Sequence, residues 1–421
     1  MRLQRNLRLT NVRIIDGRGG PPIEDGVLEV TSDGVIGFVG RAAEAPDGRD
    51  ADVRDLRGRT LLPGFVDCHV HLGFALANGP YHRLQNDPAL IHLESAARIR
   101  ETLEAGITSA RDLGGLSAGF REAIERGLIA GPRLKLAVSP ISHTAGHGDF
   151  HVPGGEVAYT VPELIELADT VEEVRRATRR VLRQGADLVK ICTSGGMGSR
   201  HDHPDDEGLR LDEVRAIVDE LDRHGGKPIA AHAQGRVGIL TALRGGVTSV
   251  EHGYGIDDEG LDLLEERGAF LVPTLSTVFA IDKEKMQPYH YAKKVKWSEI
   301  TKKNIGHAIA RKAKIALGTD AGVCPHARNL RELGHLVELG MSPMDALVAG
   351  TRTGAEALGI SDEVGTLETG KLADLVVTDA DPLRDIHALA DPAHIEIVMQ
   401  AGVVMKDDVM NKLGKADGLS R

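Results

Sequence analysis

Apolar and polar positions follow a repeating rhythm through the middle of the chain. Between Leu62 and about Leu358, short runs of apolar, often β-branched residues alternate with longer stretches in which apolar residues recur every three or four positions. The short runs are typical of buried parallel strands and the long stretches of amphipathic helices. Eight runs qualify as strands: residues 64–71, 107–112, 134–140, 187–192, 228–233, 248–252, 270–275 and 314–320. Eight strand–helix repeats predict a closed (β/α)8 barrel of the TIM type, with helices around the outside.

The clearest helical stretches follow the third, fourth and eighth predicted strands. They span residues 171–184, 212–223, 328–339 and 343–358, and each places charged residues between its apolar positions. This spacing gives a helix one apolar face, which packs on the sheet, and one solvated face.

Both ends of the chain follow a two-residue rhythm instead. Residues 12–15, 26–30 and 34–39 form short alternating runs, and Asp-Gly dipeptides lie between them, as in β-hairpins. Residues 373–378 and 395–399 repeat this pattern near the C-terminus. We therefore expect residues 1–62 and 359–421 to form one small β-sandwich domain together, and residues 63–358 to form the barrel.

The charge and aromatic content of the chain exclude some classes of binding partner. The formal net charge of −11 and the aromatic content of 3% argue against nucleic acid, which needs clustered cations and stacking platforms. No apolar run reaches the roughly 18 residues of a membrane span, and no signal-peptide pattern opens the chain, so we expect a cytoplasmic protein. A homo-oligomer is left open. The scattered cysteines Cys68, Cys192 and Cys324 read as reduced, buried thiols rather than as disulfides.

Candidate functional residues lie where the predicted strands end. His69 and His71 are one residue apart, so they share a strand face and can converge on one ion. Lys190 interrupts an apolar strand, where an unpaired ammonium is costly. Either Lys190 is salt-bridged or reaches out at the strand end, or its amine has reacted with CO2 to give an anionic carbamate that can bridge two cations.

Three further side chains follow other strands. His232 and His252 end the fifth and sixth predicted strands, and Asp320 follows the eighth. Alone, each has an ordinary explanation, such as a structural histidine or an aspartate that caps a helix. Because strand ends of a barrel meet at one mouth, the set together indicates a metal site. Asp320 is then the natural general base, since a carboxylate can take a proton from water activated by a metal.

This order of residues resembles the amidohydrolase superfamily, in particular its binuclear members with a carboxylated lysine. The resemblance extends to residues 62–67 and 365–376 and so covers almost the whole chain. It implies that one divalent metal ion is held by His69, His71 and Asp320. It also implies that a second ion is held by His232 and His252, with CO2 as a carbamate on Lys190 between the two. Zinc is the expected metal, and manganese or cobalt could replace it.

Two loops refine the expected substrate. Residues 142–149 and 193–199 resemble loops of dipeptidases and carboxypeptidases that act on Xaa-Pro or N-acyl amino acids, and of ochratoxin-hydrolysing amidases. The resemblance implies hydrolysis of an amide bond in a small molecule or peptide. We expect His147 to act in catalysis by donating to the carbonyl oxygen. Further candidate substrate contacts are His143, Arg200 and Tyr254, with Arg328 and Arg331 as alternatives to Arg200 for a substrate carboxylate.

Two other functions remain open. A cyclic amidohydrolase, acting on a ring such as a hydantoin or dihydroorotate, would use the same metal ligands, although the loop 143–149 favours a linear amide. A paralogue that only binds ligands could keep the barrel without catalysis, but all six predicted metal-site residues are present.

Overall fold

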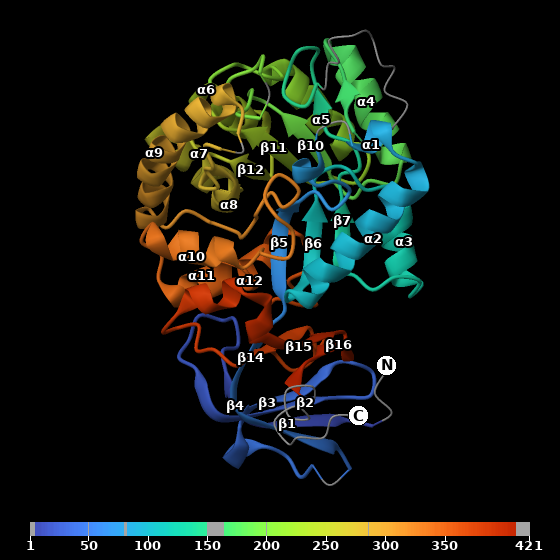
Figure 1. Ribbon diagram of the computed structural model, residues 1–421, viewed down its shortest axis with the longest axis vertical. Coiled ribbons are helices and arrows are strands. Elements are labelled where there is room, and N and C mark those ends of the chain that lie inside the picture. Colours follow the sequence, from blue (N-terminus) through green and yellow to red (C-terminus); the bar gives the residue numbers. More distant parts are fainter. Residues whose placement is uncertain are drawn as a thin grey trace.

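The computed structural model describes residues 5–48, 50–79, 82–149, 164–198, 200–284 and 286–409. A barrel of strands and helices fills the upper part of Figure 1, and a sheet built from both ends of the chain lies below it. In the described part of the chain, no helix is both long and apolar enough to cross a membrane.

The lower sheet joins the two ends of the chain. Its seven strands run in the order β16-β15-β14-β4-β1-β2-β3, and β4 pairs antiparallel with β14. At β3, the Ile36 amide donates to the Lys371 carbonyl at 2.8 Å, which links the N-terminal strands to the segment before β14. The domain has its own apolar core, which contains Leu28, Leu61 and Val377. The predicted β-sandwich from both termini is confirmed, whereas its exact boundaries stay a prediction. The strands are β1 (Leu7–Ile14), β2 (Ile23–Val30), β3 (Ile36–Arg41), β4 (Asp52–Pro63), β14 (Leu375–Thr378), β15 (Ile395–Gln400) and β16 (Val403–Asp407).

The barrel strands are parallel and form two sheets of hydrogen-bonded neighbours. One has the order β5-β6-β7 and the other β13-β12-β11-β10-β8-β9. The strands are β5 (Phe65–Val70), β6 (Ile107–Asp112), β7 (Arg133–Leu136), β8 (Ile141–Ser142), β9 (Glu166–Leu167), β10 (Val189–Cys192), β11 (Ile229–Ala233), β12 (Ser249–His252) and β13 (Phe270–Val272). Their side chains are almost all buried, as the continuous apolar runs predict.

Hydrogen bonds link these two sheets at both junctions. Residues 314–321 lie between β13 and β5, because the Leu271 amide donates to Lys314 (2.9 Å) and the Cys68 amide donates to Leu317 (2.8 Å). On the other side, the Asp187 amide before β10 donates to Leu136 of β7 at 2.8 Å. The eighth predicted strand therefore occupies its place in the barrel, held by isolated bridges rather than a long ladder.

Two predicted elements are interrupted. The third strand was expected to run over residues 134–140, but β7 ends at Leu136, because Val138 has φ +62° and Pro140 has no amide proton to donate. The helix expected over residues 343–358 is split into α11 (Pro343–Ala349) and α12 (Arg352–Ala357). Between them, the Gly350 carbonyl accepts from the Val66 amide of β5 at 2.8 Å, which ties this break to the barrel.

The helices lie around the barrel (Figure 1). The apolar face predicted for the stretch 171–184 is confirmed, since Val174, Ala177 and Val181 of α4 are buried. The remaining bounds are α1 (His82–Gln85), α2 (Pro88–Glu104), α3 (Ala118–Glu125), α4 (Val171–Arg183), α5 (Leu211–Asp222), α6 (Arg236–Gly245), α7 (Asp258–Arg267), α8 (Leu275–Val278), α9 (Pro288–Ala310) and α10 (Arg331–Glu338). Short 3-10 helices span Ala42–Glu44, Leu76–Asn78, Ile386–Ala390 and Pro392–His394.

Tight packing where the barrel closes gives a stability prediction. A Cβ atom on Gly318 would overlap a methyl group of Val272 and lie 2.9 Å from Cβ of His69. We expect Gly318→Ala to destabilise the protein by about 1–3 kcal/mol, as overpacked cores do. Thermal unfolding checks this, with Gly20→Ala as the control, because a Cβ on Gly20 meets no atom within 4 Å. Equal melting temperatures of the two variants would contradict the packing argument.

Candidate active site

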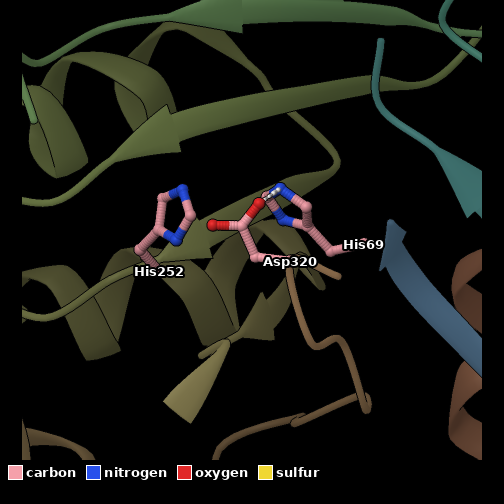
Figure 2. A group of neighbouring side chains, drawn as sticks. All are labelled: His69, His252 and Asp320. Carbon is pink, nitrogen blue, oxygen red and sulfur yellow. Dashed lines mark ion pairs between the residues drawn. The ribbon is translucent and has the colours of Figure 1, made fainter. Parts of the chain in front are cut away.

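The predicted ligands converge at the carboxyl ends of the barrel strands. His69, His252 and Asp320 each offer one ligand atom, and these atoms all lie within 4.8 Å of one another. Figure 2 shows the Asp320 carboxylate between the two imidazole rings. His71 joins the group through its Nε2 atom, 3.3 Å from Oδ1 of Asp320, and His232 through its ring, 4.5 Å from that of His252.

The sixth residue of the predicted set, Lys190, is buried in β10 with 3% of its surface exposed. Among the described residues, its ammonium has no hydrogen-bond acceptor and no carboxylate within ion-pair distance, although the charges of Glu251 and Asp320 act on it. Burial lowers the pKa of Lys190 and so favours the neutral amine. The salt bridge, one of the alternatives to a carbamate on this lysine, is therefore absent from the described part of the chain.

Burial also sets the charge of the ligand atoms. It lowers the pKa of His252 to about 3 and the pKa values of His69 and His232 well below the usual value, so these rings are neutral. His71 differs, because the hydrogen bond and charge of Asp320 outweigh burial and raise its pKa. Burial would raise the pKa of Asp320, but its hydrogen bond to His71 and the neighbouring histidines hold it below the usual value. Neutral imidazoles beside a carboxylate are a donor set suited to a divalent metal.

The backbone bends sharply where the ligands leave their strands. His252, Thr274 and Asp320 adopt left-handed conformations, with φ of +72°, +49° and +59°. Residues other than glycine rarely adopt this conformation, which is unfavourable for a β-branched residue such as Thr274. Such strain tends to collect at functional sites, where the surrounding structure holds it in place.

Neighbouring groups fix the orientation of each imidazole. Nδ1 of His69 lies 2.9 Å from Glu251, Nδ1 of His71 lies 2.8 Å from the Gly114 carbonyl, and Nδ1 of His252 lies 2.7 Å from the Thr274 hydroxyl. In all three rings, Nδ1 has a partner and Nε2 is left for other contacts. Partners of this kind orient metal-binding histidines and raise their affinity.

Glu251 and Arg111 form a buried pair that the sequence analysis missed. Glu251 is completely buried and accepts from Nη2 of Arg111 at 2.6 Å. Arg111 also donates to the Cys68 carbonyl (2.6 Å) and to the Ser249 hydroxyl (3.0 Å). An acidic residue next to a predicted ligand was the only signal for this pair, because its partner lies 140 residues away in the chain.

His147, the predicted donor to the substrate, reaches the same mouth. Its ring stacks on His232, with centroids 3.9 Å apart, and its Nδ1 lies 3.0 Å from Oδ2 of Asp202. Asp202 is 3% exposed and also accepts from the Gly196 amide at 2.7 Å. A Cβ on Gly196 would overlap the His147 ring, so glycine makes room for it. No pattern in the sequence had indicated a role for Asp202.

The residues predicted to contact substrate lie in different places, some buried and some at the surface. Tyr254 is fully buried, and its hydroxyl is engaged by the Thr274 hydroxyl at 3.0 Å, so it supports His252 from behind. His143 lines a polar surface depression with Asp169, Glu207 and Arg210. The three arginines, Arg200, Arg328 and Arg331, are exposed, and Arg328 donates to the Ala390 carbonyl. Substrate binding by His143, Tyr254 and these arginines stays a prediction.

The three cysteines are buried free thiols. Burial raises the pKa of Cys192 to about 11 and of Cys324 to about 12, and it raises the pKa of Cys68 as well. The expectation of inert, reduced thiols agrees with these values, because metal ligation requires a thiolate.

A parallel barrel with a cluster of polar side chains at the carboxyl ends of its strands is typical of enzymes. The model of the amidohydrolase family matches residues 60–405, so the chain belongs to this family and is a hydrolytic enzyme.

The chain is similar to an ochratoxinase, a Xaa-Pro dipeptidase and an imidazolonepropionase. An ochratoxinase from Aspergillus niger is 33% identical, over 92% of this chain and 84% of its own length. The crystal structure of A. niger ochratoxinase superposes with a TM-score of 0.86 at 31% identity, covering 96% of each chain. A Xaa-Pro dipeptidase with methionine bound in its active site gives a TM-score of 0.86 at 29% identity, covering 95% of this chain and 99% of that one. An imidazolonepropionase from Acidiphilium cryptum (strain JF-5) is 27% identical, over 96% of this chain and 98% of its own length.

The contact between Thr274 and His252 gives a prediction about metal binding. Thr274→Val keeps the shape of the side chain but removes the hydroxyl beside Nδ1 of His252. We expect it to weaken metal binding by about 10–100-fold, because His252 loses its orienting partner. Metal affinity measured by competition with a chelator checks this. Thr274→Ser, which keeps the hydroxyl, serves as the control, and equal affinities of the two variants would refute the orienting role.

Proposed function

We propose that this enzyme is a binuclear metal-dependent amidase that releases a C-terminal amino acid from a dipeptide or an N-acyl amino acid, including ochratoxin-like amides. The observation that carries the proposal is the buried cluster of His69, His252 and Asp320 beside the isolated Lys190. The similarity to both an ochratoxinase and a Xaa-Pro dipeptidase supports the substrate class, since each named relative is a hydrolase.

The residues present fit a two-metal centre. We assign one ion to His69, His71 and Asp320 and the other to His232 and His252. A carbamate on Lys190 would supply a further anionic ligand to both ions, and zinc suits the imidazole-rich donor set. The close approach of three ligand atoms and the burial of a lysine without a counter-ion are the supporting observations. When bound, the ions supply an activated water and polarise the scissile carbonyl.

The remaining steps belong to the side chains. The Asp320 carboxylate takes the proton of the attacking water at one oxygen and passes it to the leaving nitrogen. His147 donates from Nε2 to the carbonyl oxygen as negative charge develops there, because Asp202 holds its Nδ1. The stacked pair of His147 and His232 keeps this donor beside the ligands.

A cyclic amidohydrolase is the second candidate. The similarity to an imidazolonepropionase favours it, at 27% identity over 96% of this chain. The same ligand set would serve ring opening, so the difference between the two functions lies in the loops above the mouth.

A substrate screen separates these functions. We expect the zinc-loaded enzyme to hydrolyse Xaa-Pro dipeptides and N-acyl amino acids at least 10-fold faster than hydantoins, dihydroorotate or an imidazolone. Release of free amino acid, followed by chromatography, is the measurement. Preferential opening of any of these rings would replace the amidase proposal with the cyclic one.

Lys190 tests the bridging carbamate. Lys190→Ala should lower kcat/KM by about 100-fold or more and reduce the bound metal, because the second ion loses a shared ligand. Metal analysis and turnover after loading with zinc and bicarbonate measure both effects. Lys314→Ala is the control, since Lys314 is 45% exposed and pairs with Glu356. Undiminished hydrolysis by Lys190→Ala would contradict the bridging role.

A further inference from the structure

One buried cation near the mouth has no assigned role. Lys294, in the second turn of α9, is 3% exposed. Its ammonium donates to the carbonyl oxygens of Thr277 and Ala280, at the end of α8. No carboxylate lies within 4.0 Å of it in the described part of the chain. An ammonium buried with only two neutral acceptors keeps a third donor and a charge that no anion balances.

Lys294 lies close to the candidate metal cluster. Thr277, which accepts from Lys294 through its carbonyl, donates from its hydroxyl to the Thr319 carbonyl at 3.0 Å. Thr319 immediately precedes Asp320, and the negative charge of Asp320 acts on Lys294. Lys294 is therefore connected through Thr277 and Thr319 to the segment that carries the proposed general base, Asp320.

We propose that Lys294 binds the α-carboxylate of the amino acid that the enzyme releases. This inference rests on the proposed function and names the side chain that recognises the carboxylate of the leaving group. A single carbon separates that carboxylate from the leaving nitrogen, so a carbonyl held at the metal cluster brings the carboxylate close to the cluster. An anion there would balance the buried ammonium.

Other cations of the mouth are less suited to this role. Lys293 is engaged by the carbonyl groups of Gly196 and Asp202, where it ties α9 to the loop after β10. Arg200, the cation favoured by the sequence, is exposed, and an exposed ion pair contributes little because water screens it. A buried pair discriminates more strongly between charged and neutral ligands.

The test compares two substrates that differ only in charge. One is an N-acyl-L-amino acid, and the other is the same compound with the carboxylate replaced by a carboxamide. We expect the wild-type enzyme to prefer the carboxylate in kcat/KM by about 100-fold or more, and Lys294→Met to lose most of this preference. Lys294→Gln removes the charge but keeps a donor for the α8 carbonyls, so it covers the case in which Lys294→Met does not fold. Lys296→Met is the neutral control, because Lys296 is exposed and pairs with Asp205.

Two results would overturn the assignment, and a binding measurement decides it if the enzyme is inactive on both compounds. An equal loss of kcat/KM for both substrates in Lys294→Gln would show that Lys294 only stabilises α8 and does not bind the carboxylate. Loss of the preference in Arg200→Met, with Lys294→Gln unchanged, would assign the carboxylate to Arg200. If the wild-type enzyme hydrolyses neither compound, the proposed function fails. Calorimetry then decides the inference alone: tighter binding of the carboxylate than of the carboxamide, lost in Lys294→Gln, supports it, and equal binding rejects it.

Discussion

The buried ion pair of Arg111 and Glu251 is the constraint on which the site depends. Arg111 reaches from β6 to the Cys68 carbonyl of β5 and to Glu251 of β12, so it ties together strands on both sides of the barrel interior. Glu251 in turn accepts from His69, whose other nitrogen faces Asp320. Removing either partner would leave an uncompensated buried charge, which is far more costly than losing a surface pair. The same ion pair therefore holds the barrel strands together and orients His69.

At the carboxyl ends of the strands, the backbone adopts unusual conformations. Strands end early, and the chain turns through left-handed conformations at His252, Thr274 and Asp320. These turns bring the side chains of His252 and Asp320 together and place the Thr274 hydroxyl beside His252. In a regular strand, adjacent side chains point to opposite faces of the sheet, so two neighbouring residues could not both face the candidate site. The local strain is tolerated because the buried barrel around it is rigid.

Segments outside the barrel strands bring further side chains to the candidate site. The loop after β10 carries Asp202, which holds His147 over His232. The first turns of α9 fasten this loop through Lys293 and approach the cluster through Lys294. Under the proposed function, ring opening and linear amide hydrolysis would use the same predicted ligands, so we expect the loop after β10 and the first turns of α9 to decide between them.

The sequence alone predicted the barrel, the sandwich from both termini and the convergence of the ligand set, because strand periodicity and strand-end position are local properties. His69 and His71 share a face by spacing alone. Pairing of Arg111 with Glu251 and of His147 with Asp202 was decided only by the tertiary structure. These partners lie 140 and 55 residues apart, and contacts over such separations arise from how the elements pack and leave no periodic signal in the chain. For the same reason, the buried ammonium of Lys294 became visible only once the first turns of α9 were packed against α8.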